Sequence, residues 1–217
     1  MQTIFGDRAT CYHCYRPKSS CMCEYIRPIE THTKFIILMH PKEFKKTKNG
    51  TGHLTHLSLP NSEWFMGIDF SACERINEIL KSHQSYILYP CKEAINLSHE
   101  PLYPSKPLAI FLIDSTWACA LKMMRLSRNL RDLPRISFDA TKRSEFKIKE
   151  QPLEYCLSTI ESTHTVLELL NQWGIETIVH ETLKTFLTPF HAMIEYQLQC
   201  IENSSSQTIR FKESIKN

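Results

Sequence analysis

Four cysteines near the start of the chain have a spacing typical of a metal site. They form two close pairs between positions 11 and 23: Cys11, Cys14, Cys21 and Cys23. Four thiolates can supply a closed tetrahedral zinc site, and the bound metal would replace a hydrophobic core that so short a segment cannot build. Reduced, unliganded cysteines or a redox pair are the alternatives. The tight spacing favours structural zinc, because four cysteines leave no open position for catalysis by the metal.

A second group of chemically capable residues follows the apolar run at 108–113. It consists of an acid, two hydroxyls and an indole: Asp114, Ser115, Thr116 and Trp117. The run predicts a strand buried on both faces of a parallel sheet, and the apolar spacing after Trp117 predicts a helix. Open α/β sheets bind ligands at such strand-to-helix turns. A helix N-cap, with Ser115 as one candidate, explains one polar residue here but not all of them, so we interpret the segment as a functional turn.

The elements that must position these groups alternate along the chain. We expect strands at residues 34–40, 64–67, 86–90, 108–113 and 136–138, and helices at 53–59, 70–82, 91–98, 117–131, 156–170 and 181–200. Alternating strands and helices predict an α/β fold with a mostly parallel sheet and helices on both faces. The turns after Leu88, after Ile113 and around Leu157 are then expected to meet at one edge. Ser158 and Glu161 form a capping box, and Pro189 marks a break or a new helix start.

Composition narrows the class of protein. The 217 residues are 42% hydrophobic, which suffices for one domain with a small appendage. No apolar run approaches the roughly 20 residues needed to cross a bilayer, and no secretory signal is visible. Nine cysteines, an odd number, argue against a complete disulfide framework, so we expect reduced thiols and a cytoplasmic location. Only five glycines are present, and neither glycine-rich phosphate-binding motif occurs.

The net charge of +3 does not by itself indicate nucleic-acid binding, so the evidence for it has to come from how the basic residues are distributed. Runs of lysine and arginine are usually solvated surface. The helix expected at 117–131, however, starts at the predicted ligand turn, and Arg125 and Arg128 would share one of its faces, which favours contact with phosphates. The candidates for RNA contact are Lys42, Lys45, Lys46, Arg125, Arg128, Arg135, Lys147 and Lys149.

Taken in order, these motifs resemble those of the DTW-domain family of tRNA-uridine aminocarboxypropyltransferases, over nearly the whole chain. They are the four cysteines with Pro17; His40, Pro41 and Glu43; Asn49 and Thr51; Leu88, Tyr89 and Pro90; Asp114, Thr116 and Trp117; and Leu157, Ser158, Thr159 and Glu161. Three positions depart from the family pattern. Ser115 replaces a usual glycine, Gly50 separates an Asn-Thr pair, and Lys149 replaces an arginine and so loses bidentate phosphate recognition.

The resemblance implies a SPOUT-like fold with a C-terminal trefoil knot that binds S-adenosylmethionine. It implies transfer of the 3-amino-3-carboxypropyl group from this donor to N3 of a tRNA uridine, leaving 5′-methylthioadenosine. We expect a four-cysteine zinc module at residues 1–30, a catalytic domain at 31–203 and a polar tail at 204–217. The expected partner is tRNA, with no membrane and no obligatory protein partner.

Catalysis of this reaction requires orientation of the donor and loss of the proton on uridine N3. We expect Asp114 to take this proton, with burial raising its pKa, and we group Thr116 and Trp117 with it as catalytic residues. Donor-binding residues, acting largely through their backbone, are expected to be Leu88, Tyr89, Pro90, Ile113, Asp114, Ser115, Leu157, Ser158 and Thr159. Two alternatives stay open: a transferase acting on ribosomal RNA, and a zinc-containing RNA-binding protein without catalysis.

Overall fold

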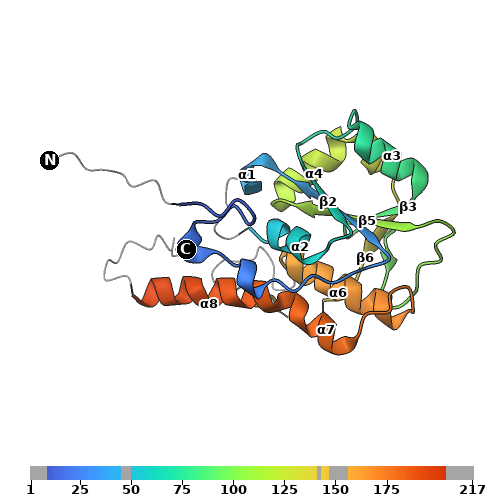
Figure 1. Cartoon of the computed structure of the whole chain (residues 1–217). Coiled ribbons are helices and arrows are strands. Elements are labelled where there is room, and N and C mark those ends of the chain that lie inside the picture. Colours follow the sequence, from blue (N-terminus) through green and yellow to red (C-terminus); the bar gives the residue numbers. More distant parts are fainter. Residues whose placement is uncertain (1–8, 45–49, 141–142, 147–155, 204–217) are drawn as a thin grey trace, which may run out of the picture.

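The computed structural model describes residues 9–44, 50–140, 143–146 and 156–203, which form a parallel β-sheet with helices on both faces (Figure 1). The sheet has six strands in the order β2-β1-β5-β3-β6-β4, and every neighbouring pair is parallel. The strands are β1 (Lys34–Met39), β2 (Ser62–Met66), β3 (Gln84–Leu88), β4 (Ile95–Asn96), β5 (Leu108–Asp114) and β6 (Arg135–Ser137). The predicted α/β fold with a largely parallel sheet is confirmed.

Strand β5 lies inside the sheet, between β1 and β3. Its side chains alternate between two hydrophobic cores: Ile110 and Leu112 belong to one, Ala109 and Phe111 to the other. Burial on both faces is what a continuous run of apolar residues predicts for a parallel strand. The chain segment that ends at Asp114 is therefore held from both sides.

Helices cover the two faces of the sheet. They are α1 (Pro41–Phe44), α2 (Gly52–Ser58), α3 (Glu74–Ser82), α4 (Trp117–Leu126), α5 (Arg128–Arg131), α6 (Thr159–Gln172), α7 (His180–Lys184) and α8 (Thr188–Glu202), with short 3-10 turns η1 (Lys18–Ser20), η2 (Cys23–Tyr25) and η3 (Thr185–Leu187). Residues of α2, α6 and α8 belong to one core, and residues of α3, α4 and α5 to the other. Pro189 lies in the first turn of α8, which confirms a new helix start there. Within the described ranges, no helix has the length and apolar character required to cross a bilayer.

Two expected helices are wrong in detail. Residues 91–98 contain a turn and β4, not a helix, because Asn96 pairs with Ser137 of β6. The helix expected at 117–131 breaks at Ser127, which is fully buried. The Ser127 Oγ accepts the N–H of Phe70 at 3.1 Å, a long-range contact that fixes the break. Arg125 and Arg128 therefore lie on separate helices and do not share one helical face.

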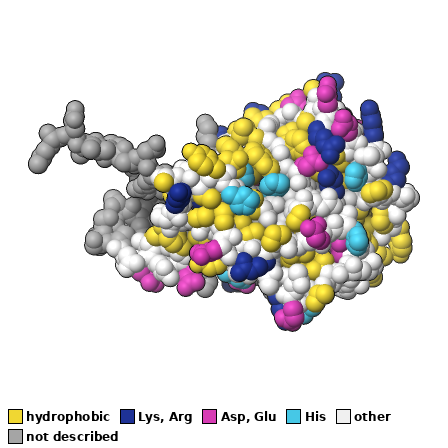
Figure 2. All heavy atoms as spheres, viewed as in Figure 1, with side chains coloured by type: hydrophobic (Ala, Val, Ile, Leu, Met, Phe, Trp, Pro, Cys, Tyr) yellow, Lys and Arg dark blue, Asp and Glu magenta, His cyan; other side chains and the backbone are white. Residues whose placement is uncertain are grey.

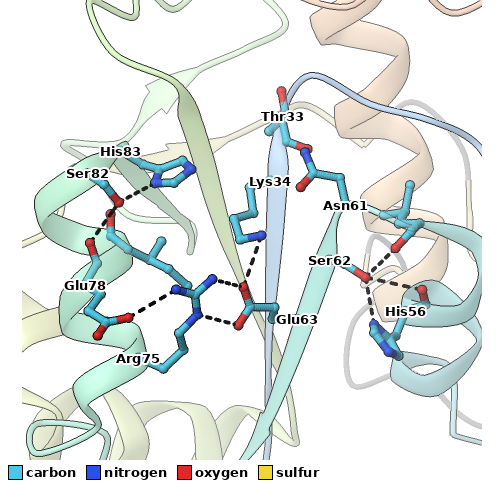
Figure 3. A network of polar contacts seen from close by, with 12 residues as sticks. Thr33, Lys34, His56, Asn61, Ser62, Glu63, Arg75, Glu78, Ser82 and His83 are labelled. Carbon is cyan, nitrogen blue, oxygen red and sulfur yellow. Dashed lines mark hydrogen bonds and ion pairs between the residues drawn. The ribbon is translucent and has the colours of Figure 1, made fainter.

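A polar network ties the edge strand β2 to its neighbours (Figure 3). The Glu63 carboxylate accepts two hydrogen bonds from Arg75 of α3, at 2.7 and 2.9 Å, and forms an ion pair with Lys34 of β1 at 3.1 Å. Arg75 also reaches Glu78 at 3.1 Å. These contacts, those from Arg75 foremost, lower the pKa of Glu63 to about 2. Charged side chains on an exposed edge also oppose pairing with another chain.

Candidate active site and metal centre

A cavity of about 710 Å³ lies where the parallel strands end. The last residues of β3, β5 and β6, namely Leu88, Asp114 and Ser137, all line it. The three turns expected to converge do so here, and the cavity is lined by Leu88, Pro90, Ile113, Asp114, Ser115, Leu157, Ser158 and Thr159 from the expected donor-binding set. Tyr89 is not part of this lining. Its ring meets Trp117 edge-on at 6.1 Å, and the Arg135 guanidinium lies 5.4 Å from its centre.

Three elements surround the Asp114 carboxylate, which is 8% exposed. Its Oδ1 accepts a hydrogen bond of 2.7 Å from the Oγ1 of Thr159, the first residue of α6. Its backbone carbonyl accepts the N–H of His40 at 3.1 Å, which ties it to β1. Gly52, the first residue of α2, lies against the carboxylate, and a Cβ built there would be 2.8 Å from the Asp114 Cγ. Only glycine fits this close approach, so β5, α6 and α2 together fix the position of the acid.

Glu161 fastens one wall of the cavity. The predicted capping box is confirmed: the Ser158 N–H and Oγ both donate to Glu161, at 2.8 and 2.6 Å. The same carboxylate also accepts the Ser144 Oγ at 2.8 Å and the Glu145 N–H at 2.7 Å. Phe146, which follows in this segment, lines the cavity. A local capping motif therefore also holds a distant segment at the site, which its sequence pattern does not indicate.

Trp117 and Thr116 begin helix α4 at the cavity. Trp117 lines the cavity yet is 45% exposed, so its indole is not a core residue. Thr116 occupies the N-cap position of α4 but makes no side-chain capping bond. The Ser115 Oγ donates to the Thr116 carbonyl at 3.1 Å. The suggestion that Ser115 serves as the N-cap is therefore wrong, because Thr116 occupies that position.

The described part of the cavity lining is acidic. The described residues that line the cavity include Glu43, Asp114 and Asp139 but no lysine, arginine or histidine. Asp139 accepts hydrogen bonds from Asn96 at 2.8 Å and from the His99 Nε2 at 2.7 Å, and these contacts lower its pKa. Such a lining favours a cationic ligand over a phosphate. Glu43 and Asp139 were missed as site residues, although Asp139 follows β6 much as the 114–117 turn follows β5.

The residues predicted to contact RNA are described only in part. Lys42 is exposed on α1, Arg125 on α4 and Arg128 on α5. Burial lowers the pKa of His40, and the charges of Lys42 and Lys122 lower it further. Arg135 packs on Tyr89, as described above. The predicted residues Lys45, Lys46, Lys147 and Lys149 lie outside the described ranges.

The four N-terminal cysteines converge in space. Their sulfur atoms all lie within 4.8 Å of one another. The Sγ atoms of Cys11 and Cys23 are 3.7 Å apart, as are those of Cys14 and Cys21. Tetrahedral zinc with bonds of about 2.3 Å requires sulfur atoms about 3.8 Å apart, so the cluster fits a zinc ion. The backbone N–H groups of Cys14 and His13 lower the pKa of Cys11 to about 6, whereas burial raises that of Cys23.

Aromatic rings join the cysteine segment to the sheet domain. Tyr15 packs against His53 of α2 at 5.2 Å, and Phe44 of α1 stacks on Trp64 of β2 at 5.7 Å and 17°. Hydrophobic and histidine side chains gather over α1 and α2 on the face shown in Figure 2. Burial lowers the pKa of His53 to about 4, so this ring is neutral near pH 7.

The fold and the site define an α/β protein with a ligand cavity at the carboxyl edge of a parallel sheet and a four-cysteine cluster suited to zinc. The chain belongs to the DTW domain family, whose sequence model matches residues 8–198.

Three curated relatives illustrate this membership. The chain is 30% identical over 202 residues to tRNA-uridine aminocarboxypropyltransferase 2 of Mus musculus, covering 88% of this chain and 64% of that protein. It is 29% identical over 209 residues to the protein of the same name from Drosophila melanogaster, covering 92% and 80%. It is 23% identical over 248 residues to tRNA-uridine aminocarboxypropyltransferase A of Arabidopsis thaliana, covering 100% and 91%. The chain thus spans less than two thirds of the length of the mouse protein. No solved structure matches this chain.

Proposed function

We propose that this protein transfers the 3-amino-3-carboxypropyl group of S-adenosylmethionine to N3 of a uridine in tRNA, leaving 5′-methylthioadenosine. The observation that carries the proposal is the placement of Asp114 in an acidic cavity at the carboxyl edge of the sheet, clamped by Thr159 and Gly52. The names of the relatives support this reaction and tRNA as the acceptor.

The cavity suits the proposed donor. S-adenosylmethionine carries a sulfonium and an ammonium, and the described lining offers the carboxylates of Glu43, Asp114 and Asp139 to these positive charges. The cavity volume of about 710 Å³ lies in the range of small-molecule sites. After transfer the sulfur is a neutral thioether, so the acidic lining favours the donor over the by-product and assists release of the latter.

Asp114 is the proposed general base. Uridine N3 bears a proton and becomes a nucleophile when Asp114 removes it. The N3 electron pair then forms a bond to the carbon of the aminocarboxypropyl group that is attached to sulfur. The carbon–sulfur bond breaks and its electrons pass to the sulfonium, which becomes the thioether of 5′-methylthioadenosine. Because the sulfonium activates three carbons, the clamped geometry has to select which one meets N3.

The acceptor base has to enter the cavity unpaired, because N3 lies on the Watson–Crick edge. Trp117, half-exposed at the cavity, offers an indole face on which such a base can stack. Lys42, Arg125 and Arg135 are proposed to meet the flanking phosphates. Arg128, on the separate helix α5, is kept as a more peripheral phosphate contact.

Structural zinc in the four-cysteine cluster and a SPOUT-like fold with a C-terminal trefoil knot belong to the same proposal. The sulfur spacing supports the zinc. Residues 157–159 and the ends of the strands line the same cavity. This arrangement supports a donor site that is built partly from the C-terminal region. The division into a module at 1–30 and a catalytic domain at 31–203 is retained as part of the proposal.

Calorimetric titration of the metal-loaded protein with S-adenosylmethionine tests the donor site. We expect saturable binding to one site per chain. A complete lack of donor affinity together with salt-sensitive RNA binding would favour the non-catalytic alternative. Assaying transfer to tRNA and to ribosomal RNA side by side decides between the two acceptors, and we expect modification of tRNA.

A further inference from the structure

A short hairpin near the start of the chain presents two tyrosine rings to solvent. It comprises residues 9–18 and is closed by two backbone hydrogen bonds, of 2.7 and 2.8 Å. We call residues 12–15 the hairpin tip, in which Tyr12 is 89% exposed and Tyr15 is 41% exposed. The hairpin contains no aspartate or glutamate. Exposed aromatic rings without neighbouring acids in the same segment point to a binding surface rather than to a part of the core.

The backbone of Tyr15 is in a conformation that tyrosine rarely adopts. Its φ is 57°, and among the described residues other than glycine it alone has a positive φ. The left-handed conformation is disfavoured for a residue with a Cβ, because the Cβ comes close to the following carbonyl oxygen, whereas glycine adopts it readily. The sequence thus keeps a large aromatic ring where glycine would be less strained. Strain of this kind is typical of residues that have a function.

The hairpin tip lies beside the cavity. Helix α1 contributes to both, since Glu43 lines the cavity and the next residue, Phe44, lies 6.3 Å from the Tyr15 ring. Helix α2 does the same, since Gly52 lies against the proposed base and the next residue, His53, packs on Tyr15 at 5.2 Å. The start of the described chain accordingly runs next to α1 and α2 in Figure 1. A nucleotide next to a base in the cavity is therefore placed close to the tip.

Unpaired RNA matches the chemistry of this surface. Bases that are splayed out of a helix stack on aromatic side chains, and every base has a π face that can do so. The exposed Lys18 of the hairpin and Lys42 of α1 can meet the phosphates that link such bases. The proposed acceptor base enters the cavity unpaired, so its neighbours along the RNA are free to stack as well.

We propose that the hairpin tip binds unpaired nucleotides of the acceptor RNA next to the uridine that enters the cavity, with Tyr12 and Tyr15 as stacking surfaces. Cys11 and Cys14 bracket this tip and belong to the four-cysteine cluster, so the cluster fixes the orientation of the two rings. The inference rests on the proposed function only for the identity of the acceptor, since RNA binding by the tip requires no transfer.

Binding of unmodified tRNA to the metal-loaded protein, measured without donor, tests the proposal. Tyr12→Ala should weaken binding about 5- to 160-fold, the loss expected from one stacked base. Tyr12→Phe keeps a ring and should bind as the wild type does. Tyr103→Ala is the matched control, because Tyr103 is 83% exposed and precedes β5, at the sheet edge opposite the cavity. Single-stranded oligouridylate should compete better than duplex RNA of equal length, and Tyr12→Ala should reduce this preference.

Tyr15→Gly separates stacking from packing. Glycine is favoured at a φ of 57°, so relief of strain should offset the lost contacts with His53 and keep the melting temperature close to that of the wild type. The affinity for tRNA should nevertheless fall about 5- to 160-fold, while calorimetry shows unchanged donor affinity. A Tyr15→Gly protein that melts earlier yet binds tRNA as the wild type does would show that Tyr15 only joins the hairpin to α2.

Wild-type affinity for tRNA in both Tyr12→Ala and Tyr15→Gly would overturn the proposal. Loss of self-association in sedimentation, with tRNA binding unchanged, would also overturn it and would identify the tip as a contact between copies of this chain. If the wild type binds tRNA through the tip but transfers no group, the proposed function fails and this inference stands. If the wild type transfers the group and both variants bind tRNA normally, only this inference fails.

Discussion

In the proposed reaction, Asp114 is the residue on which the chemistry depends. It is buried, its carboxylate accepts a hydrogen bond from a hydroxyl at 2.7 Å, and it lies against Gly52, where there is no room for a Cβ. A carboxylate used only to cap α4 would need none of these contacts. The combination is typical of a group that is held in position to act on a ligand.

Replacing Asp114 by Asn removes the base while keeping the size of the side chain and an oxygen that can accept from Thr159. We expect the rate of transfer to fall about 10²–10⁴-fold, the usual contribution of general base catalysis. Donor affinity should fall less than about tenfold, because two carboxylates of the lining remain. Rapid-quench assays and calorimetry measure the two quantities. Asp132→Asn, an exposed acid that does not line the cavity, is the control, and near wild-type turnover in Asp114→Asn would exclude Asp114 as the base.

Trp117 carries the prediction about the acceptor. Stacking of a base on an aromatic ring contributes about 1–3 kcal/mol, so Trp117→Ala should raise the KM for tRNA about 5- to 160-fold. Trp117→Phe should retain most of the affinity, and Leu121→Ala, exposed on the same helix, should behave as the wild type. Steady-state kinetics with each substrate varied in turn make the distinction. If donor affinity falls instead and the KM for tRNA is unchanged, the indole packs on the donor.

At the scale of elements, the chain places its polar groups where parallel strands end. Strands β3, β5 and β6 each end at the cavity, and α6 brings Thr159 and Glu161 to the same edge. At the edge of the sheet, away from the cavity, the network around Glu63 stabilises strand β2 (Figure 3).

The Glu63 network makes stability depend on pH. The pKa of Glu63 in the folded protein, about 2, lies below the ordinary value of 4.5. Between these two pH values the unfolded chain therefore binds more protons than the folded protein. The stabilisation is therefore complete above pH 4.5 and is lost as the pH falls toward 2. Glu63→Gln should lower the free energy of unfolding by on the order of 1 kcal/mol at pH 7. This deficit in the free energy of unfolding relative to the wild type should shrink below pH 4.5.

Urea unfolding at pH 7, 4.5 and 3 measures this deficit. Glu78→Gln, which removes an exposed acid with a single contact to Arg75, is the control and should cost less. A Glu63→Gln deficit that stays constant or grows on acidification would show that the Arg75 and Lys34 contacts do not stabilise the fold.

At the scale of the whole molecule, the four-cysteine segment and the sheet domain meet through buried contacts. Elemental analysis of protein purified without chelators should give about one zinc per chain. Removing the metal should lower the thermal stability of the cysteine segment before that of the sheet, because the segment has little core of its own. Limited proteolysis with and without chelator follows the two parts. A protein that contains no metal and keeps the cysteine segment protected would rule out structural zinc.

Much of the fold and site could be predicted from local pattern, and the failures have a common cause. The sequences of β1 and β5 are continuous apolar runs, which predict burial on both faces of the sheet. The rule that ligands bind at the carboxyl ends of parallel strands, here called the strand-end rule, pointed to Leu88 and Asp114. Two features depend on partners far along the chain: β4 exists because Asn96 pairs with Ser137, and the basic helix breaks because the Ser127 hydroxyl accepts the Phe70 N–H. No local pattern contains these partners.

The lining of the site shows the same limit. Leu88 packs against one core and Tyr89 against the other, as alternation at a strand end requires, and only Leu88 lines the cavity. Asp139 could have been found by applying the strand-end rule to β6. The contacts of Glu161 with Ser144 and of Arg16 with Gly50 join segments that no sequence spacing relates.

Transfer with a doubly labelled donor tests the central claim most directly. Unmodified tRNA is incubated with the protein and S-adenosylmethionine labelled differently in its methyl group and in its aminocarboxypropyl carbons, and nucleosides and small products are identified by mass spectrometry. We predict the aminocarboxypropyl label on N3 of uridine and the methyl label in 5′-methylthioadenosine, with both products formed about 10²–10⁴-fold more slowly by Asp114→Asn. The methyl label in RNA, with S-adenosylhomocysteine as the product, would contradict the proposed function and indicate a methyltransferase.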